Sequence, residues 1–187
     1  MGSMSDTADR YRRLSDELAR TVASVPADRW GAATACEEWT ALDLIRHVVD
    51  TQGMFLGFVG EDPGDVPAVE DDAGAAWNSA RAKVQSRLDD PEGAVAEFDG
   101  FTGRTTFEAA VDRFLCTDLV LHGWDLATAT GQTAAIDPDD MSHVREAMAP
   151  LVDKMRVPSA FGAELEAPSG ADEQTTFLAF FGRRAWS

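Results

Sequence analysis

Apolar residues recur every three or four positions along most of the chain, which is the period of amphipathic helices. The first such segment spans about residues 5–25 and ends at Pro26. The second begins at Thr40, which forms a pattern like a capping box with Asp43, and it is apolar nearly all round, so we expect it to lie centrally. A third segment carries four apolar side chains on one stripe, namely Trp77, Ala80, Val84 and Leu88.

The second half of the chain continues this helical pattern after one less regular stretch. Residues 92–104 alternate apolar and polar side chains and predict a short extended segment or a turn. A long helix over about 105–129 follows, and Gly131 closes it at the position that a left-handed cap prefers. Two further helices are predicted over about 137–155 and 171–181.

These segments predict an all-α protein. Each amphipathic stripe must be covered by another, so four long helices with an extra C-terminal pair indicate a four-helix bundle. The length of 187 residues, with 44% hydrophobic and 26% charged residues, is typical of one globular domain, which we place at 5–187. Residues 1–4 are interpreted as a cloning scar ahead of the native start at Met4.

Charge and cysteine content narrow the class of protein. Thirty-three acidic and sixteen basic side chains give a formal charge of −17, which disfavours nucleic acid and anionic membrane surfaces as partners. No apolar run approaches the roughly 20 residues of a membrane span, and the polar start does not resemble a signal peptide. The two cysteines lie too far apart for a disulfide framework or a zinc knuckle, so we expect a cytoplasmic protein.

The chain has only three histidines, and two of them fall on inward faces of predicted helices. His47 shares its face of the second helix with apolar side chains. Asp118 and His122 stand four residues apart on the long helix, so they stack on one apolar face. His143 lies off the apolar stripe of its helix and is expected at the surface.

Two interpretations fit these polar residues. Each of His47, Asp118 and His122 could be a core group with a hydrogen-bond partner, which is the simpler reading of each residue alone. Taken together, two imidazoles and a carboxylate are costly to bury without a shared partner, and one divalent metal would satisfy all three. Two histidines and one carboxylate leave coordination positions open, as catalytic sites do, and they suit zinc, nickel or iron.

Three further residues bear on such a site. Asp125 follows His122 by three positions, so it could be a ligand, an acceptor behind the ligands or a structural cap, and we favour the last two roles. Cys116 points about 160° away from Asp118 round the helix and cannot join the site. Cys36 lies in a loop that could approach the mouth of the bundle, but we interpret it as a small buried packing residue. The site should therefore contain nitrogen and oxygen donors only.

Two stretches resemble a known family, the DinB-like proteins related to mycothiol-dependent maleylpyruvate isomerase. The first, similar to the second-helix segment of that family, is Cys36-Glu37-Glu38-Trp39-Thr40 leading to Asp43-Leu44-Ile45-Arg46-His47-Val48. The second resembles the most distinctive stretch of the family and runs Asp118-Leu119-Val120-Leu121-His122-Gly123-Trp124-Asp125-Leu126-Ala127, followed by Ala129-Thr130-Gly131-Gln132. The resemblance extends from about Asp9 to Trp186, and the end of the chain is similar to stand-alone actinobacterial members.

This resemblance implies a DinB-like four-helix bundle with a divalent metal, usually zinc, held by His47, Asp118 and His122. The matching acid in the isomerase is glutamate, whereas this chain has the shorter aspartate. The isomerase also carries a separate C-terminal domain that contributes to catalysis, and we find no counterpart of it in this sequence. That difference argues against the isomerase reaction itself.

Two classes of function follow from these expectations. The first is an enzyme that carries out a transfer or an isomerisation on a small electrophile. Mycothiol or another small thiol would bind the metal as thiolate and attack the electrophile, and metal-bound water is the alternative nucleophile. The second is a non-catalytic metal- or ligand-binding module, a sensor or partner protein, because basic residues near the motifs are few, chiefly Arg46, Arg104 and Arg113. By analogy with the family, the exposed face of the helix at 137–155 could form a homodimer.

Overall fold

The chain consists mainly of α-helices, and the computed structural model describes it over residues 6–36, 38–156 and 161–185. It divides into two units, Met1–Thr133 and Ala134–Ser187, which we describe one at a time. The assignment of residues 5–187 to one domain stays a prediction. The predicted cloning scar at residues 1–4 lies outside the described residues.

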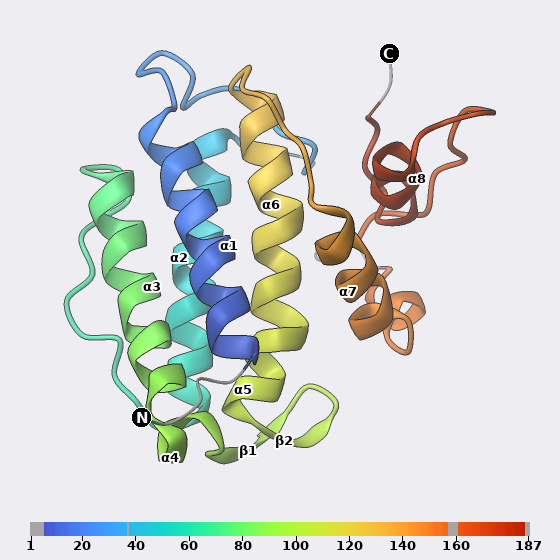
Figure 1. Cartoon of the computed structure of the whole chain (residues 1–187). Helices are drawn as coiled ribbons and strands as arrows, with labels where there is room; N and C mark the ends of the chain where they lie inside the picture. The colour runs from blue at the N-terminus through green and yellow to red at the C-terminus, as the bar shows by residue number, and fades with distance from the viewer. Residues whose placement is uncertain (1–5, 37, 157–160, 186–187) are drawn as a thin grey trace. The chain divides into compact units, whose positions relative to one another are not determined.

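Four long helices of the first unit run side by side and form the predicted bundle (Figure 1). They are α1 (Asp6–Ala23), α2 (Ala41–Phe58), α3 (Ala73–Asp89) and α6 (Cys116–Ala129). Both α1 and α2 pack against α3 and α6, so the apolar stripes of the four helices cover one another. This arrangement confirms the all-α fold class.

Two polar contacts cross the apolar interior of the bundle. The Tyr11 hydroxyl of α1 donates to Gln52 Oε1 of α2 at 2.6 Å, and both side chains are buried. Burial, with a smaller contribution from nearby Cys116, raises the pKa of Tyr11 well above its usual range, so the phenol remains a donor. Trp77 Nε1 of α3 donates to the Ser15 carbonyl at 3.2 Å. These bonds satisfy groups that would be costly to bury unpaired.

A small hairpin follows the short helix α4 (Pro91–Ala94) at one end of the bundle. Its strands β1 (Glu97–Gly100) and β2 (Gly103–Thr106) pair antiparallel, which confirms the predicted extended segment. The ring of Phe98 is buried and stacks on Phe58 of α2 with centroids 5.3 Å apart, so the hairpin is anchored to the bundle.

The helix predicted over residues 105–129 is present without a break over 107–129, but it is not a regular α-helix throughout. It consists of α5 (Phe107–Ala110), the π-helix η1 (Val111–Leu115) and α6. A π-helical turn bonds each N–H to a carbonyl five residues back and holds about one residue more than an α-helical turn. Side chains before η1 therefore point about 100° away from where a regular helix would put them relative to α6. Gly131 has a φ of 79°, which confirms the predicted left-handed cap.

The second unit contains α7 (Pro138–Met148), the 3-10 helix η2 (Val152–Met155) and α8 (Glu173–Phe180). The helix predicted over 137–155 ends at Met148, because Pro150 has no backbone N–H to donate and its ring clashes with a continuing helix. Within this unit the Gln174 side chain of α8 joins the chain ahead of α7, accepting from one backbone N–H at 2.7 Å and donating to one carbonyl at 2.9 Å.

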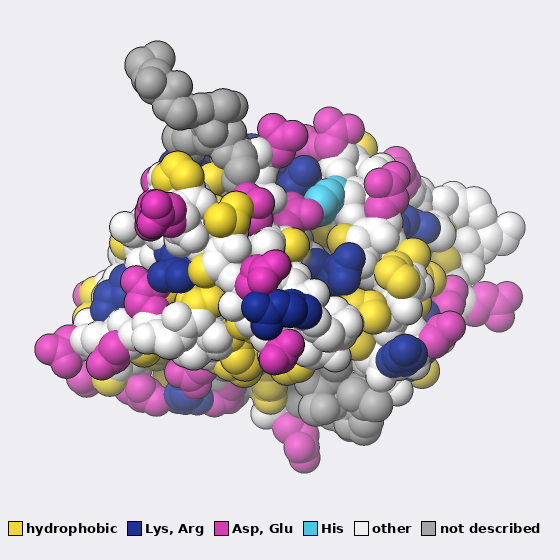
Figure 2. Space-filling view, turned by 90° about the horizontal axis from the view of Figure 1, so that it is seen from below, with side chains coloured by type: hydrophobic (Ala, Val, Ile, Leu, Met, Phe, Trp, Pro, Cys, Tyr) yellow, Lys and Arg dark blue, Asp and Glu magenta, His cyan; other side chains and the backbone are white. Residues whose placement is uncertain are grey.

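Acidic and basic side chains are interspersed on the surface. On the face in Figure 2, arginine and lysine side chains lie beside aspartate and glutamate side chains. Two such pairs join separate segments of the first unit, Arg12 with Asp89 and Arg87 with Glu61, each at 2.8 Å. Exposed pairs of this kind contribute only about 0–1 kcal/mol each. Among the described residues, no helix combines the length and the apolar character needed to cross a membrane.

The predicted capping box at the start of α2 is present, and its effect on stability can be tested by changing the pH. Thr40 Oγ1 accepts from the Asp43 backbone N–H at 3.2 Å and donates to Asp43 Oδ2 at 2.5 Å, and Arg46 Nη1 is 2.6 Å from Asp43 Oδ1. The hydrogen bonds from the hydroxyl and backbone N–H of Thr40, followed by that from Arg46, lower the pKa of Asp43 from 3.8 to about 2.

The pKa of Asp43 is lower in the folded state than in the unfolded state, so its carboxylate stabilises the fold above pH 3.8. This contribution is lost as the pH falls from 3.8 through about 2. We expect Asp43→Asn to remove the stabilisation by the carboxylate. The difference in unfolding free energy between variant and wild type should therefore narrow as the pH falls from 3.8 to about 2. Urea titrations at several pH values measure the difference. Asp28→Asn, at an exposed position, is the control. A difference in unfolding free energy between Asp43→Asn and wild type that does not change with pH would contradict the stabilising role of the Asp43 carboxylate.

Candidate metal centre

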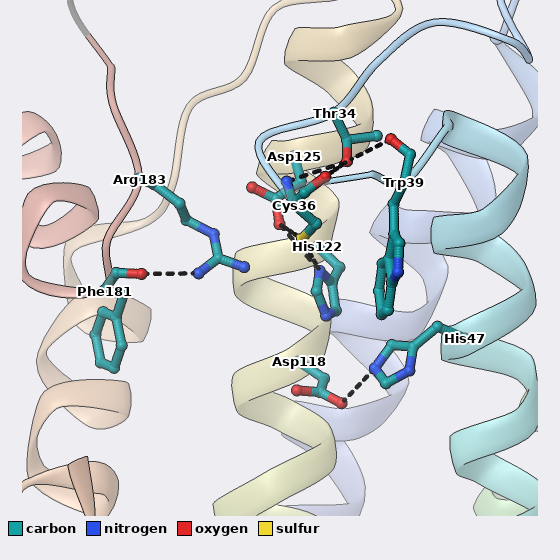
Figure 3. Close-up of polar contacts among 9 residues, drawn as sticks. All are labelled: Thr34, Cys36, Trp39, His47, Asp118, His122, Asp125, Phe181 and Arg183. Atoms are coloured by element: carbon teal, nitrogen blue, oxygen red, sulfur yellow. Dashed lines mark hydrogen bonds and ion pairs between the residues drawn. The ribbon is translucent and has the colours of Figure 1, made fainter. Parts of the chain in front are cut away.

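His47 of α2 faces Asp118 and His122 of α6, so the three residues that the sequence singled out lie together (Figure 3). His47 Nε2 is 3.7 Å from Asp118 Oδ2. The two imidazole rings have centroids 5.2 Å apart and are inclined at 81°. One donor atom from each residue lies within 4.8 Å of the other two. That these residues bind a metal stays a prediction.

The local sequence explains why these side chains meet. The capping box at Thr40 determines where α2 begins, and so determines which face of that helix carries His47. Asp118 and His122 are separated by one helical turn of α6, so they project from the same side. Packing of α2 against α6 then turns the two faces toward each other.

The orientation of His122 is determined by Asp125, which lies behind it. His122 Nδ1 is 2.9 Å from Asp125 Oδ2, and the Asp125 side chain has no exposed surface. A carboxylate only accepts hydrogen bonds, so in the neutral ring the proton is on Nδ1 and the lone pair is on Nε2. Figure 3 shows Nε2 directed toward Asp118 and His47. Metal-binding histidines commonly have such a carboxylate behind them, which accords with the role favoured for Asp125.

Trp39 forms a wall of the site that the sequence did not assign. Its ring centroid is 4.8 Å from that of His47 and 6.2 Å from that of His122. The loop holds the indole there, because the Trp39 carbonyl accepts from the backbone N–H and the hydroxyl of Thr34, at 3.0 and 3.1 Å. Glu38, beside it, has a φ of 65°, a conformation that non-glycine residues adopt only when their surroundings impose it.

The structure corrects the expectation for Cys36, which is not a buried packing residue. Its side chain is half-buried, with Sγ 3.6 Å from Asp125 Oδ2 and 4.0 Å from His122 Nδ1. A turn in the loop brings it there, since Thr34 Oγ1 accepts from the Cys36 backbone N–H at 3.1 Å. The donors around His122 therefore include sulfur as well as nitrogen and oxygen. Cys116 is fully buried and does not join His47, Asp118 and His122, as predicted.

The set of His47, Asp118 and His122 fits a divalent ion by chemistry and by spacing. Imidazole nitrogens and a carboxylate oxygen are common zinc ligands with bonds of about 2.0–2.2 Å, so two donors to one ion lie up to roughly 4 Å apart. The 3.7 Å between His47 and Asp118 agrees with this spacing. The side chains of His47 and Asp118 are 36% and 26% exposed, so a small molecule can reach the donors.

Comparison with known proteins places these residues inside a recognised family segment. The family described as the mycothiol maleylpyruvate isomerase N-terminal domain matches residues 11–127, which include the site residues from Cys36 to Asp125. Two curated relatives, both uncharacterized proteins of Mycobacterium tuberculosis, are each 33% identical over 175 residues, covering 92% of this chain and 95% of the relative. No solved structure matches the chain.

Proposed function

Because the chain belongs to the family of the mycothiol maleylpyruvate isomerase N-terminal domain, we propose that it binds a divalent metal and acts as a thiol-dependent transferase or isomerase on a small electrophile. His47, Asp118 and His122 would hold the ion, zinc first, with nickel or iron as alternatives. The observation that carries this proposal is the convergence of two imidazoles and a carboxylate from two helices on one point.

The bound ion would supply one kind of chemistry, which is to hold a small thiol such as mycothiol as its nucleophilic thiolate. Asp125 would keep His122 in the tautomer whose Nε2 is free to bind, because its buried carboxylate accepts the Nδ1–H. Trp39 would exclude water from one side of both imidazoles. The partly exposed side of His47 and Asp118 would admit the thiol and the electrophile.

Calorimetry with the zinc-loaded protein tests this proposal. We expect mycothiol to bind the zinc-loaded protein and not the metal-free protein, and the thiol to be consumed with at least one member of a panel of small electrophiles. Asp118→Asn is the matched variant, because it keeps the size of the side chain but removes the negative charge that attracts the cation, so it should bind zinc and thiol more weakly. Equal thiol binding with and without zinc, together with no turnover, would refute the proposal.

A second candidate is a non-catalytic metal- or ligand-binding module. It is favoured by the ion pairs of two arginines that lie near the motifs in the sequence. Arg46 Nη1 is 2.6 Å from Asp43 and its Nη2 is 2.5 Å from Glu70, while Arg104 Nη2 is 2.9 Å from Glu97. These arginines are engaged by carboxylates, so they are poorly placed to bind an acidic substrate. Thiol binding without turnover on any electrophile of the panel would favour this second function.

A further inference from the structure

A second group of donors lies on the other edge of the His122 ring. Cys36 Sγ is 3.6 Å from Asp125 Oδ2 and 4.0 Å from His122 Nδ1, and those two atoms are 2.9 Å apart. The group thus brings one sulfur, one nitrogen and one oxygen to a common point. Asp125 and His122 are buried, and Cys36 is half-buried.

We propose that Cys36, His122 and Asp125 form a second cation site, which takes a thiophilic divalent ion such as zinc or cadmium. Such an ion bonds to sulfur at about 2.3 Å and to nitrogen or oxygen at about 2.0–2.2 Å, so its tetrahedral ligands lie roughly 3.3–3.6 Å apart. Of the three observed separations, 3.6 Å falls in that range, 2.9 Å lies below it and 4.0 Å lies above it. Small side-chain adjustments would bring the donors to the required spacing.

Charge balance favours a divalent ion at this buried position. When the ion binds, the Cys36 thiol loses its proton to solvent, and the thiolate and the Asp125 carboxylate together carry two negative charges. These charges neutralise the ion, which lowers the cost of holding it away from water. The set of His47, Asp118 and His122 carries only one negative charge, so the two sets differ in donor softness and in net charge.

The two sets compete for one imidazole. A neutral imidazole has a single lone pair, so His122 binds either through Nε2, toward His47 and Asp118, or through Nδ1, toward Cys36 and Asp125. Binding through Nδ1 replaces the hydrogen bond to Asp125 and places the ring proton on Nε2. A thiophilic ion at the sulfur site would therefore withdraw His122 from the other set. This competition rests on the proposed function, whereas the sulfur site itself does not.

The Cys36 loop is already held in the position that the site requires. Thr34 Oγ1 accepts from the Cys36 backbone N–H at 3.1 Å, and the Thr34 backbone N–H donates to the Trp39 carbonyl at 3.0 Å. These bonds connect the cysteine backbone to the segment that leads into α2. Binding an ion would therefore cost little ordering of the loop.

Cadmium titration with ultraviolet absorption tests the sulfur site. We expect one equivalent of cadmium to produce a sulfur-to-cadmium charge-transfer band in the wild-type protein. Cys36→Ser should lose the band and bind cadmium at least about tenfold more weakly, because soft thiolate ligands select such ions. Cys116→Ser is the matched control and should keep the band, since that thiol is buried elsewhere. His47→Ala should also keep it, because His47 belongs only to the other set.

A second measurement uses the wild-type protein and does not depend on the folding of a variant. Alkylation of Cys36 by iodoacetamide, followed by mass spectrometry, should slow at least about tenfold with cadmium or zinc and stay unchanged with magnesium, which does not favour sulfur. Absence of the band in wild type, its persistence in Cys36→Ser, or alkylation that cadmium does not slow would each overturn the sulfur site. Thiol binding to the zinc-loaded protein tests the other set, so the two proposals can fail separately.

Discussion

Replacing His122 by alanine is expected to abolish stoichiometric metal binding and to lower the unfolding free energy of the metal-free protein by about 3 kcal/mol. His122 supplies a donor to both sets, so neither remains complete without it. The loss of stability has a separate cause, because Asp125 is fully buried and would lose the hydrogen bond that it accepts at 2.9 Å. Elemental analysis measures the metal, and urea unfolding in a chelator measures the stability.

The control for this experiment is the third histidine. His143 of α7 belongs to neither donor set, so the His143→Ala protein should retain the metal. Zinc at about 100 times its dissociation constant should stabilise the wild-type protein by about 2.7 kcal/mol and the His122→Ala variant by nothing measurable. A full complement of metal in His122→Ala would contradict the assignment. A wild-type protein that binds no metal would favour the hydrogen-bonded core instead.

Replacing Asp125 by alanine is expected to weaken zinc binding by His47, Asp118 and His122 about 10- to 100-fold, the usual cost of removing a carboxylate behind a histidine ligand. The physical reason is that the ring of His122 loses the acceptor that determines its tautomer and its orientation. Asp125→Asn should recover much of the affinity, because the amide oxygen can still accept the Nδ1–H. Competition titrations with a chromophoric chelator measure the affinities.

These two variants also distinguish the roles open to Asp125. If the carboxylate were itself the essential ligand of the zinc ion, asparagine would bind as weakly as alanine, because an amide oxygen is a poor substitute for a charged ligand. If Asp125 oriented His122, asparagine would lie close to wild type. Unchanged affinity in Asp125→Ala would show that it does neither.

The helices of this protein were predictable because their signals are local. The spacing of apolar residues, the capping box at Thr40 and the glycine at position 131 each act within a few residues, and the structure has helices beginning or ending at these positions. The exception is the helix predicted over 105–129. Its π-helical turn η1 adds about one residue to a turn without a local sequence signal such as a proline or glycine, so only the folded structure reveals that residues before Val111 are rotated relative to α6.

Within the candidate site, the sequence by itself determined which helical residues meet. His47 lies on the inward face of one helix, and Asp118 and His122 project from one face of another, so a bundle brings them together. The scarcity of histidine made this pattern stand out, with three in 187 residues.

Only the tertiary structure decided what surrounds His122. Cys36 and Trp39 lie in a loop, where no periodicity relates sequence position to direction in space, so their approach to the imidazoles could not be derived from spacing. The loop bends toward α6 because of hydrogen bonds at Thr34, which depend on the folded backbone. Sulfur was therefore absent from the predicted donor set, although the tertiary structure brings it within 4.0 Å of His122.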